Sequence, residues 1–389
     1  MRIGEFTDSF LPIVDGVGRV VHNYASMLGE MGHECYVIAP MTDTGYRGFN
    51  KFEIVDYISA KFQQYKTGVP NIDPHFKARM KNVELDIIHT HSPFSSGQTA
   101  IYYAKKRGVP LIGSFHSKYR DDFKQAMGVD VLADVGIKIV VDFYERCDQV
   151  WTVSNHAADT LREYGYRGNI IIMPNGSNIP EIHPNDRELA KEKFTLGDLP
   201  VFLYVGQLNW KKNINRIFLA SAEIAKKGHQ FKLILAGKGP HEDEIKRMAT
   251  EVLPDRGVIF TGHIEDQRLL GSLYQCASMF VFPSLYDSAA LVVREAAVFG
   301  VPSVVVKKTG PSEVITDREN GFLCDDTTES LAAIMEEAVL NPDLMMKIGK
   351  KAQTTIPVPW NTLMDDVVNR YEMLIDSYKK LGLYQKKKK

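Results

Sequence analysis

The chain has 389 residues, of which 44% are hydrophobic and 24% charged, and its formal net charge at pH 7 is -1. This length suits two domains with separate cores, and the composition is typical of a globular protein. The balanced charge argues against general nucleic-acid binding, which needs a basic surplus. The four cysteines, Cys35, Cys147, Cys276 and Cys324, show neither CxxC nor metal-ligand spacing, which predicts a reduced cytosolic protein.

The chain shows no targeting or membrane-spanning pattern. Its first residues, RIGEF, already resemble a strand and carry no secretory signal, and no apolar run reaches transmembrane length. We therefore expect a cytoplasmic location, with peripheral attachment to the inner face of the cell membrane left open.

In the first half, apolar runs typical of buried strands alternate with helical stretches such as 18–31, which predicts a parallel, Rossmann-like sheet. The runs are CYVIAP, LDIIHTH, VPLIGSFH, QVWTVS and NIIIMPNG. Gly16 and Gly18 precede the helix at 18–31, where a missing Cβ allows a phosphate to approach the backbone. They do not form a GxGxxG fingerprint, and no acid follows at the position that binds a nicotinamide ribose, which disfavours an oxidoreductase.

Three histidines, His89, His91 and His116, fall at the carboxyl ends of predicted strands, the edge where parallel sheets bind ligands. Strand alternation places His89 and His91 on one face. No cysteine or third ligand accompanies them in the sequence, so we predict no metal site there. The residues alone favour hydrogen-bonded histidines of the core or its rim.

The segment 174–200 is polar and rich in turn-forming residues, and beyond it the alternation resumes with VFLYVG, FKLILAG, GVIFTG, SMFVFP and VPSVVV. We therefore place a domain boundary near residue 180. A helical pattern over 360–381 follows, and the terminal QKKKK is interpreted as a solvated end.

Two loops of the second half carry cations or glycines after predicted strands. In VGQLNWKKN, Lys211 and Lys212 could neutralise a diphosphate or simply decorate the surface. In AGKGP, Gly237 and Gly239 could admit a phosphate or form a plain turn.

The stretch SLYDSAALVVREAAVFGVP holds two acids, Asp287 and Glu295, in apolar surroundings. Ser288 is a suitable N-cap, which predicts a helix over 289–299, with Gly300 as its stop signal. Asp287 would then lie on the loop after a buried strand, and Glu295 about two helical turns further on. A helix start favours phosphate and a carboxylate accepts hydrogen bonds from sugar hydroxyls, although capping and solvated roles explain the spacing equally well.

Taken together, these motifs resemble the retaining, nucleotide-sugar-dependent glycosyltransferases of the GT-B fold (family 4 type), a group that includes bacterial 1,2-diacylglycerol glucosyltransferases. The resemblance runs along nearly the whole chain, through HTHSPFSSG, SFHSKYRDDF, MPNG, GQLNWKKN, AGKGP, FPSLYD to REA, and ENGFL. It implies an α/β protein with two Rossmann-like domains facing across a cleft. The first, 1–178, would bind the acceptor and be packed by a C-terminal helix of about 365–389, and the second, 179–364, would bind the nucleotide sugar.

The resemblance also implies roles for individual residues. Asp287 would contact hydroxyls of the transferred sugar, Glu295 would bind the ribose, and His116 would lie near the anomeric carbon and assist catalysis. The donor-binding set would be Gly16, Gly18, Gln207, Lys211, Lys212, Gly237, Leu291, Val292 and Glu295, with backbone amides of Leu291 and Val292 on the diphosphate. The acceptor-binding set would be His91, Lys118 and Tyr119. Neither a metal nor another cofactor is implied, and the donor would be a UDP-sugar, most simply UDP-glucose.

The sequence departs from the family pattern beside the sugar and the diphosphate. Asp287 stands where the family usually has Glu, and Ser288 and the two alanines after it replace the usual aromatic and glycine residues. Gln207 stands where the family commonly has Arg. Loss of that charge-assisted hydrogen bond would cost about 1.5 to 3 kcal/mol unless Lys211 compensates.

Between Arg47 and Lys124 there are thirteen Lys and Arg against seven Asp and Glu. Apolar and aromatic residues are interspersed among these cations: Phe76, Met80, Tyr102 and Tyr103. This mixture suits contact with an anionic membrane, although a solvated face over ordinary core residues explains it nearly as well. We expect transfer of a hexose to a membrane lipid such as diacylglycerol. The alternatives are an acceptor that is soluble or polysaccharide-linked, and a non-catalytic sugar-nucleotide binding protein.

Overall fold

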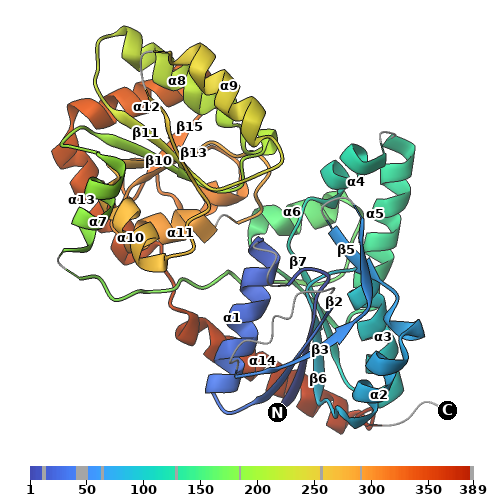
Figure 1. The fold of residues 1–389 in the computed structure, drawn as a ribbon. Helices are drawn as coiled ribbons and strands as arrows, with labels where there is room; N and C mark the ends of the chain where they lie inside the picture. Colours follow the sequence, from blue (N-terminus) through green and yellow to red (C-terminus); the bar gives the residue numbers. More distant parts are fainter. Residues whose placement is uncertain are drawn as a thin grey trace. The chain divides into compact units, whose positions relative to one another are not determined.

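The computed structural model describes residues 1–10, 15–40, 51–62, 65–127, 130–183, 185–254, 257–289 and 291–385. The chain divides into two compact units (Figure 1). The N-terminal unit comprises Met1–Asn175 together with Trp360–Lys389, and the C-terminal unit comprises Gly176–Pro359. The remote segment from Trp360 therefore completes the unit in which the chain begins.

The N-terminal unit is built on a parallel sheet of seven strands in the order β3-β2-β1-β6-β7-β8-β9. These strands are β1 (Arg2–Phe6), β2 (Glu34–Pro40), β3 (Glu53–Tyr57), β6 (Ile87–Thr90), β7 (Leu111–Phe115), β8 (Gln149–Thr152) and β9 (Ile170–Ile172). A separate antiparallel pair is formed by β4 (Ser59–Phe62) and β5 (Tyr65–Gly68). Strands β1, β6 and β7 are buried along nearly their whole length, as expected for a sheet covered on both faces.

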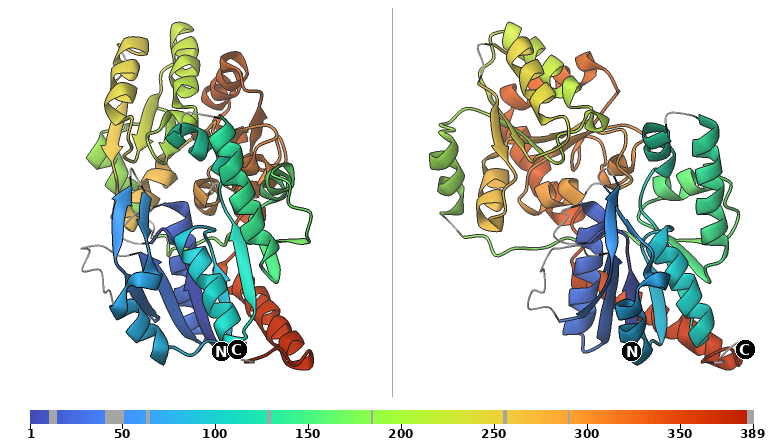
Figure 2. Two further views of the ribbon diagram at one scale, coloured as in Figure 1. Left: turned by 90° about the vertical axis from the view of Figure 1, so that its right-hand side faces the viewer. Right: turned by 45° about the vertical axis from the view of Figure 1, so that its right-hand side comes forward.

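Helices flank this sheet on both sides (Figure 2). They are α1 (Gly16–Glu30), η1 (Pro70–Ile72), α2 (Pro74–Asn82), α3 (Ser95–Arg107), α4 (Tyr119–Met127), α5 (Asp130–Glu145), α6 (Asn155–Glu163) and α14 (Trp360–Lys380). The C-terminal helix α14 packs against α1, and Trp360 sets its ring edge-on to that of Tyr24 with the ring centroids 5.8 Å apart. This contact places Tyr371 of α14 beside the carboxyl end of the sheet's central strands.

The C-terminal unit contains a second parallel sheet, in the order β12-β11-β10-β13-β14-β15. Its strands are β10 (Val201–Val205), β11 (Lys232–Ala236), β12 (Ile259–Gly262), β13 (Met279–Phe282), β14 (Ser303–Val306) and β15 (Phe322–Cys324). Its helices are α7 (Asp186–Phe194), η2 (Trp210–Lys212), α8 (Ile214–Lys226), α9 (Glu242–Val252), α10 (Gln267–Cys276), α11 (Leu291–Val298), η3 (Gly310–Val314), α12 (Thr328–Leu340) and α13 (Pro342–Thr355). The two sheets confirm the predicted α/β class with two Rossmann-like domains.

In each sheet the strand order reverses at a central strand. β1 lies between β2 and β6, and β10 lies between β11 and β13. The loops that leave β10 and β13 therefore diverge at the carboxyl edge of the C-terminal sheet. In open α/β sheets this switch point is where ligands bind, and it is the first place to look for a site.

The structure corrects three helix predictions. Helix α1 begins at Gly16 rather than at 18, because Asp15 caps it by accepting a hydrogen bond from the backbone N–H of Gly18 at 2.7 Å. Helix α11 begins at Leu291, three residues after Ser288, since the chain at Ser288 still lies as a loop against Gly310. Helix α14 runs from Trp360 to Lys380 rather than over 365–389, because the buried Trp360 anchors its first turn.

The structure also bears on the cysteines, on membrane-spanning helices and on the terminal lysines. All four cysteines are free thiols. Among the described residues, no helix combines the length and apolarity that crossing a bilayer requires. The terminal residues 386–389, which are the whole lysine run, lie outside the described part of the chain.

Candidate active site

The loops after β10 and β13 meet through an ion pair in the C-terminal unit. Lys212 ends the short helix η2 that follows β10, and its Nζ lies 2.7 Å from Oδ1 of Asp287, which follows β13. Asn209 starts η2 by accepting a hydrogen bond from the backbone N–H of Lys211 at 3.0 Å. Both charged side chains are largely shielded from solvent. The switch point thus holds a cation and a carboxylate side by side.

The second carboxylate oxygen of Asp287 does not take part in this ion pair. Oδ2 is buried and has no hydrogen-bond partner among the residues that the structure describes. A buried carboxylate oxygen without a donor is costly, so this atom is suited to accept a hydrogen bond from a bound hydroxyl. The backbone here is closely held, since a Cβ on Gly310 would lie 2.0 Å from the carbonyl oxygen of Ser288.

The second acid of the sequence motif, Glu295, lies on α11. Its Oε2 accepts a hydrogen bond from the hydroxyl of Tyr274 at 3.1 Å. Because α11 begins at Leu291, Glu295 lies about one turn into the helix. The sequence had led us to expect two turns. Leu291 and Val292 occupy the first turn, where backbone N–H groups have no partner within the helix.

Two further donor-side candidates lie on the adjoining loops. The side chain of Gln207 is exposed, and its backbone carbonyl accepts a hydrogen bond from Tyr204 at 2.9 Å. Gly237 has φ 143°, and a Cβ there would lie 1.9 Å from the carbonyl oxygen of Gly206. Glycine at 237 is therefore required by the close approach of the β10 and β11 loops. Lys211 sits over the ring of Tyr286, with Nζ 4.9 Å from the ring centroid.

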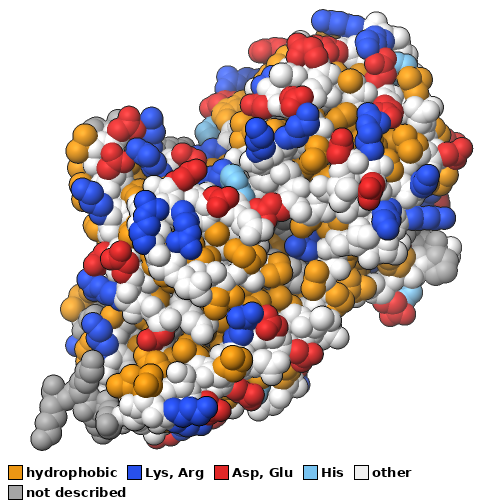
Figure 3. All heavy atoms as spheres, turned by 180° about the vertical axis from the view of Figure 1, so that it is seen from behind, with side chains coloured by type: hydrophobic (Ala, Val, Ile, Leu, Met, Phe, Trp, Pro, Cys, Tyr) orange, Lys and Arg blue, Asp and Glu red, His pale blue; other side chains and the backbone are white. Residues whose placement is uncertain are grey.

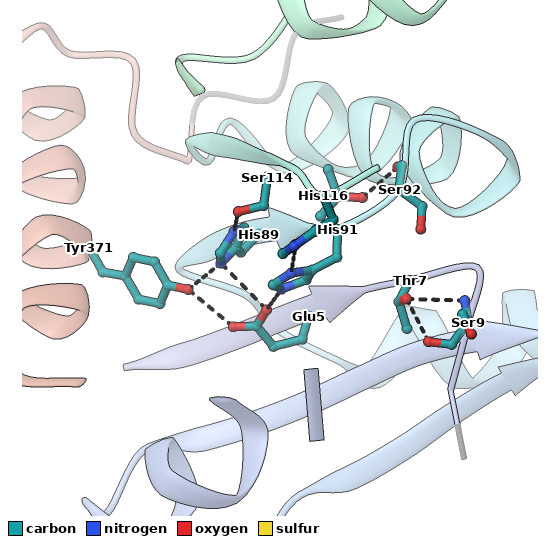
Figure 4. Close-up of polar contacts among 10 residues, drawn as sticks. Glu5, Thr7, Ser9, His89, His91, Ser92, Ser114, His116 and Tyr371 are labelled. Atoms are coloured by element: carbon teal, nitrogen blue, oxygen red, sulfur yellow. Dashed lines mark hydrogen bonds and ion pairs between the residues drawn. The ribbon is translucent and has the colours of Figure 1, made fainter. Parts of the chain in front are cut away.

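The histidines of the N-terminal unit form a buried hydrogen-bonded network (Figure 4). His89 bonds through Nδ1 to the hydroxyl of Tyr371 at 2.6 Å and through Nε2 to the hydroxyl of Ser114 at 2.7 Å. His91 bonds through Nε2 to Oε2 of Glu5 at 2.8 Å and through Nδ1 to Nε2 of His116 at 3.0 Å. The hydroxyl of Tyr371 donates to Oε1 of Glu5 at 3.1 Å and closes the chain of contacts.

Burial controls the protonation of this network. Desolvation raises the pKa of Glu5 to about 8, opposed in part by the hydrogen bond from Tyr371. Desolvation lowers the pKa of His91 to about 3 and lowers those of His89 and His116 well below their usual range. All three imidazoles are therefore neutral at pH 7, and each presents one N–H and one lone pair.

Sequence analysis missed Glu5 and assigned no role to Tyr371. Glu5 is the one acid in the buried strand β1, a signal that could have marked it. Tyr371 comes from α14, and no local pattern connects it to the sheet. The sequence offered no third ligand for His89 and His91, yet the ligand-type atoms of Glu5, His89 and His91 lie within 4.8 Å of one another. Each of these atoms is engaged in the hydrogen bonds described above.

The predicted phosphate loop of the N-terminal unit has a carboxylate at its helix start. Gly16 is exposed, whereas Gly18 is buried and its N–H donates to Oδ1 of Asp15. The hydroxyl of Ser9 donates to the other oxygen of Asp15. The amide of Gly18 is thus occupied by the cap.

Two family models match the chain along most of its length. The model for Glycosyltransferase Family 4 matches residues 14–179, and that for Glycosyl transferases group 1 matches residues 186–355. The chain is a glycosyltransferase with a Family 4 domain followed by a group 1 domain. The match of the group 1 model covers both loops of the Lys212 and Asp287 pair.

Curated relatives of this glycosyltransferase include a glucosyldiacylglycerol synthase and a mannosyltransferase. It is 26% identical over 359 residues to the alpha-monoglucosyldiacylglycerol synthase of Streptococcus pneumoniae, covering 88% of this chain and 80% of that protein. It is 28% identical over 349 residues to the GDP-mannose-dependent alpha-mannosyltransferase of Corynebacterium glutamicum, covering 86% of this chain and 80% of that protein.

Solved structures place the glycosyltransferase in the GT-B fold class. Sucrose-phosphate synthase from Thermosynechococcus elongatus matches with a TM-score of 0.81 at 20% identity, over 97% of this chain and 100% of that chain. Anabaena HepE in complex with UDP and glucose matches with a TM-score of 0.79 at 17% identity, over 96% and 99% of the two chains.

The acceptor-side candidates of this glycosyltransferase differ in exposure. Lys118 is half-buried and lines a surface pocket of about 230 Å³ with Arg120, His156 and Glu163. Tyr119 is buried and packs edge-on against Phe115. His91 is also buried, so both of these residues can reach a ligand only through the neighbours that they hold.

The expected mixture of cations and apolar residues over 47–124 does not form a single face. Phe76, Met80 and Tyr103 are buried in the core, and only Tyr102 is exposed. Helical and strand periodicity turns these three side chains inward, so their spacing among cations in the sequence misled the prediction. On the face drawn in Figure 3, Lys and Arg side chains alternate with Asp and Glu.

Proposed function

We propose that this glycosyltransferase moves a hexose, most simply glucose from UDP-glucose, to a membrane lipid such as diacylglycerol, with retention of configuration. The ion pair of Lys212 with Asp287 carries the proposal, because it leaves Oδ2 of Asp287 unpartnered at the switch point. The name of the pneumococcal relative supports the lipid acceptor and the glucosyl group. The mannosyltransferase relatives make a GDP-sugar the second candidate donor.

On the donor side, Asp287 would accept hydrogen bonds from sugar hydroxyls and Glu295 from the ribose. The first-turn amides of Leu291 and Val292 would bind the diphosphate, since a helix start presents N–H groups and a partial positive charge. Lys212 would stabilise the charge that develops on the leaving diphosphate, the largest catalytic contribution in reactions of this class. Lys211 and Gln207 would complete the diphosphate contacts, and Gly237 would hold the loop that carries them. Gly16 and Gly18 would approach the phosphate, as the resemblance implies.

At the reacting centre, the bond from the anomeric carbon to the phosphate oxygen would break as the acceptor hydroxyl bonds to the same face of the sugar. The leaving phosphate would take the proton of the acceptor hydroxyl, so no side chain has to accept that proton. His116 would orient the reacting groups through hydrogen bonds. His91 and Tyr119 would act by holding their neighbours, and Lys118 would contact the acceptor.

Helix α5 offers a surface for membrane contact. Four of its apolar side chains are exposed; three follow one another at intervals of four positions and the fourth is adjacent to the first of them, so they lie on one side of the helix. They are Val131, Leu132, Val135 and Ile139. A lipid acceptor lies in a bilayer, and an apolar helix face with flanking Lys138 suits contact with the bilayer surface. We place the enzyme in the cytoplasm, attached peripherally to the inner face of the membrane.

The test is release of nucleotide diphosphate from a panel of UDP- and GDP-sugars, with and without diacylglycerol liposomes. Native protein is compared with Asp287→Asn and Glu295→Gln, and with Asp343→Asn as a control carboxyl in the first turn of α13. Lipid-dependent release that is lost in the first two variants and kept in the control would support the proposal. Turnover with soluble acceptors alone would reject the lipid, and donor binding without any turnover would reject catalysis.

A further inference from the structure

The direction of each hydrogen bond around Glu5 limits how the network can be protonated. Tyr371 has one hydroxyl proton and donates it to Oε1 of Glu5, so Nδ1 of His89 must donate to the oxygen of Tyr371. Nε2 of His89 then accepts from the hydroxyl of Ser114. While Tyr371 donates to Glu5, this side of the network therefore has a single arrangement.

The other side has two arrangements. If Glu5 is neutral, its Oε2–H donates to Nε2 of His91, and Nδ1–H of His91 donates to Nε2 of His116. The proton of His116 then sits on Nδ1. If Glu5 is ionised, Nε2–H of His91 donates to the carboxylate, Nδ1 of His91 accepts from Nε2–H of His116, and Nδ1 of His116 carries a lone pair.

We propose that Glu5 and Tyr371 are positioning residues that set the tautomer of His116, so that its Nδ1 donates a hydrogen bond while Glu5 is neutral and accepts one after Glu5 ionises. His116 is half-buried, and its Nδ1 makes no hydrogen bond within the described part of the chain, so this nitrogen is the one able to meet a ligand. The role of His116 toward substrate rests on the proposed function.

The interconversion is a balanced proton relay. The carboxyl proton of Glu5 passes to Nε2 of His91, the Nδ1 proton of His91 passes to Nε2 of His116, and the Nδ1 proton of His116 leaves. In reverse, a proton taken up at Nδ1 of His116 is stored on Glu5. One proton is released or gained, and each imidazole is neutral in both end states.

The surroundings of Glu5 keep the two states close in free energy at moderately alkaline pH. The ionisable groups that face it are Tyr371 from α14, His89 from β6, His91 directly after β6, Tyr24 from α1 and Cys35 from β2. None of these carries a charge at neutral pH, since burial raises the pKa of both tyrosines and of Cys35 and lowers that of both histidines. Burial therefore controls the pKa of Glu5, about 8, and the switch should have its midpoint there.

The experiment uses the full chain labelled with 15N-histidine. Two-bond proton–nitrogen correlation spectra distinguish the two tautomers, and His116→Gln identifies the His116 signals. We expect His116 to change from the Nδ1–H to the Nε2–H form with a midpoint near pH 8. In Glu5→Gln the carbonyl oxygen accepts the hydrogen bond from Tyr371, which leaves the amide N–H to donate to Nε2 of His91, so we expect the Nδ1–H form of His116 throughout. A pH-independent tautomer in the native protein, or an unchanged switch in Glu5→Gln, would overturn the proposal.

Two further variants keep the test decisive. Tyr371→Phe removes a donor that favours the carboxylate, so the midpoint should move upward, which tests the relay even if Glu5→Gln does not fold. Asp8→Asn removes another buried carboxyl, one held by Ser95 and Ser96, and should leave the switch intact. Turnover is measured in parallel: an intact switch without any transfer would reject the proposed function alone, and transfer without a switch would reject the relay alone.

Discussion

Lys212 and Asp287, 75 positions apart in the chain, form an ion pair with Nζ 2.7 Å from Oδ1. The pair joins the loops after the two strands that flank the reversal of strand order in the C-terminal sheet. In the absence of donor, the carboxylate already neutralises the cation that we assign to the leaving diphosphate. When the donor binds, the ammonium group of Lys212 must therefore interact with both a phosphate and Asp287.

Because Lys212 is shared in this way, one substitution should have opposite effects on the binding of free nucleotide and on the rate of sugar transfer. Asp287→Asn removes a negative charge beside the diphosphate and releases Lys212, so we expect UDP alone to bind up to about fivefold more tightly, which corresponds to about 1 kcal/mol for a partly shielded pair. Transfer should nevertheless fall sharply, because the sugar loses its carboxylate. Titration calorimetry with UDP and GDP measures the first effect, and weaker binding of the free nucleotide would contradict the assignment.

The two adjacent lysines should differ in importance. Lys212→Met removes the cation held at Asp287, and we expect nucleotide affinity to fall by about 10- to 100-fold, as for loss of a charge-assisted hydrogen bond. Lys211→Met, whose parent side chain lies over Tyr286, is the matched control with a smaller loss. Equal losses would indicate that Lys211 has taken over the role of the family's arginine, and binding at several salt concentrations would show how much of each effect is electrostatic.

The loops of this site could be recognised from the sequence because each follows an apolar run and carries charged or glycine residues at the expected edge. Lys212, Asp287 and Glu295 were found in this way. The ion pair between the first two could not be foreseen, since side-chain contacts between loops depend on strand order. The start of α11 was also wrong, because Ser288 has the chemistry of a cap but is held in the loop by its contact with Gly310.

The same contact predicts a backbone requirement at 310. A Cβ there would lie 2.0 Å from the oxygen of Ser288 and 2.7 Å from that of Asp287, so Gly310→Ala must displace the acid that we propose to contact the sugar. We expect kcat/KM to fall by about tenfold or more, as misplacement of a positioned group does. Gly257→Ala, which meets no atom within 4 Å, is the control. Unchanged kcat/KM in Gly310→Ala would show that the loop adjusts freely.

The raised pKa of Glu5 predicts a pH-dependent stability. Burial raises this pKa from its usual 4.5 to about 8, so the native state holds the proton more tightly than the unfolded chain. Its stabilising contribution is complete below pH 4.5, declines as the pH rises, and is lost above about pH 8. We expect the free energy of unfolding of the native protein, relative to Glu5→Gln, to fall by a few kcal/mol between these limits. Urea unfolding measured across this range checks it, and a constant difference would contradict it.

Glu5 and Tyr371 show where sequence analysis reaches its limit. They are 366 positions apart, and their hydrogen bond depends on the return of α14 to the first sheet. Periodicity predicts that 360–381 is helical but not which sheet it joins. Strand alternation did place His89 and His91 on one face, and the structure brings their rings to 4.2 Å, yet the partners of each nitrogen come from other elements.

If the exposed apolar side of α5 contacts the membrane, substitutions there should slow transfer to lipid in vesicles without slowing the transfer reaction itself. Replacing Val131, Val135 and Ile139 together by Ser should weaken binding to vesicles that contain anionic lipid and slow transfer to lipid in those vesicles by about tenfold. Transfer to a short-chain acceptor dispersed in detergent should stay near the native rate. Leu219→Ser, an exposed leucine of α8, serves as the control. If both kinds of acceptor slow equally, α5 supports the fold rather than the membrane contact.

The return of α14 to the N-terminal unit also bears on the order of events during translation. A ribosome completes all of Gly176–Pro359 before it makes Trp360 and Tyr371. The C-terminal unit is a continuous segment and can fold as soon as it emerges. The N-terminal sheet, although translated first, must wait with Glu5 and His89 lacking the hydroxyl of Tyr371. A ribosome stalled before Trp360 would therefore carry a chain in which the hydrogen bonds of Tyr371 to Glu5 and His89 have not yet formed.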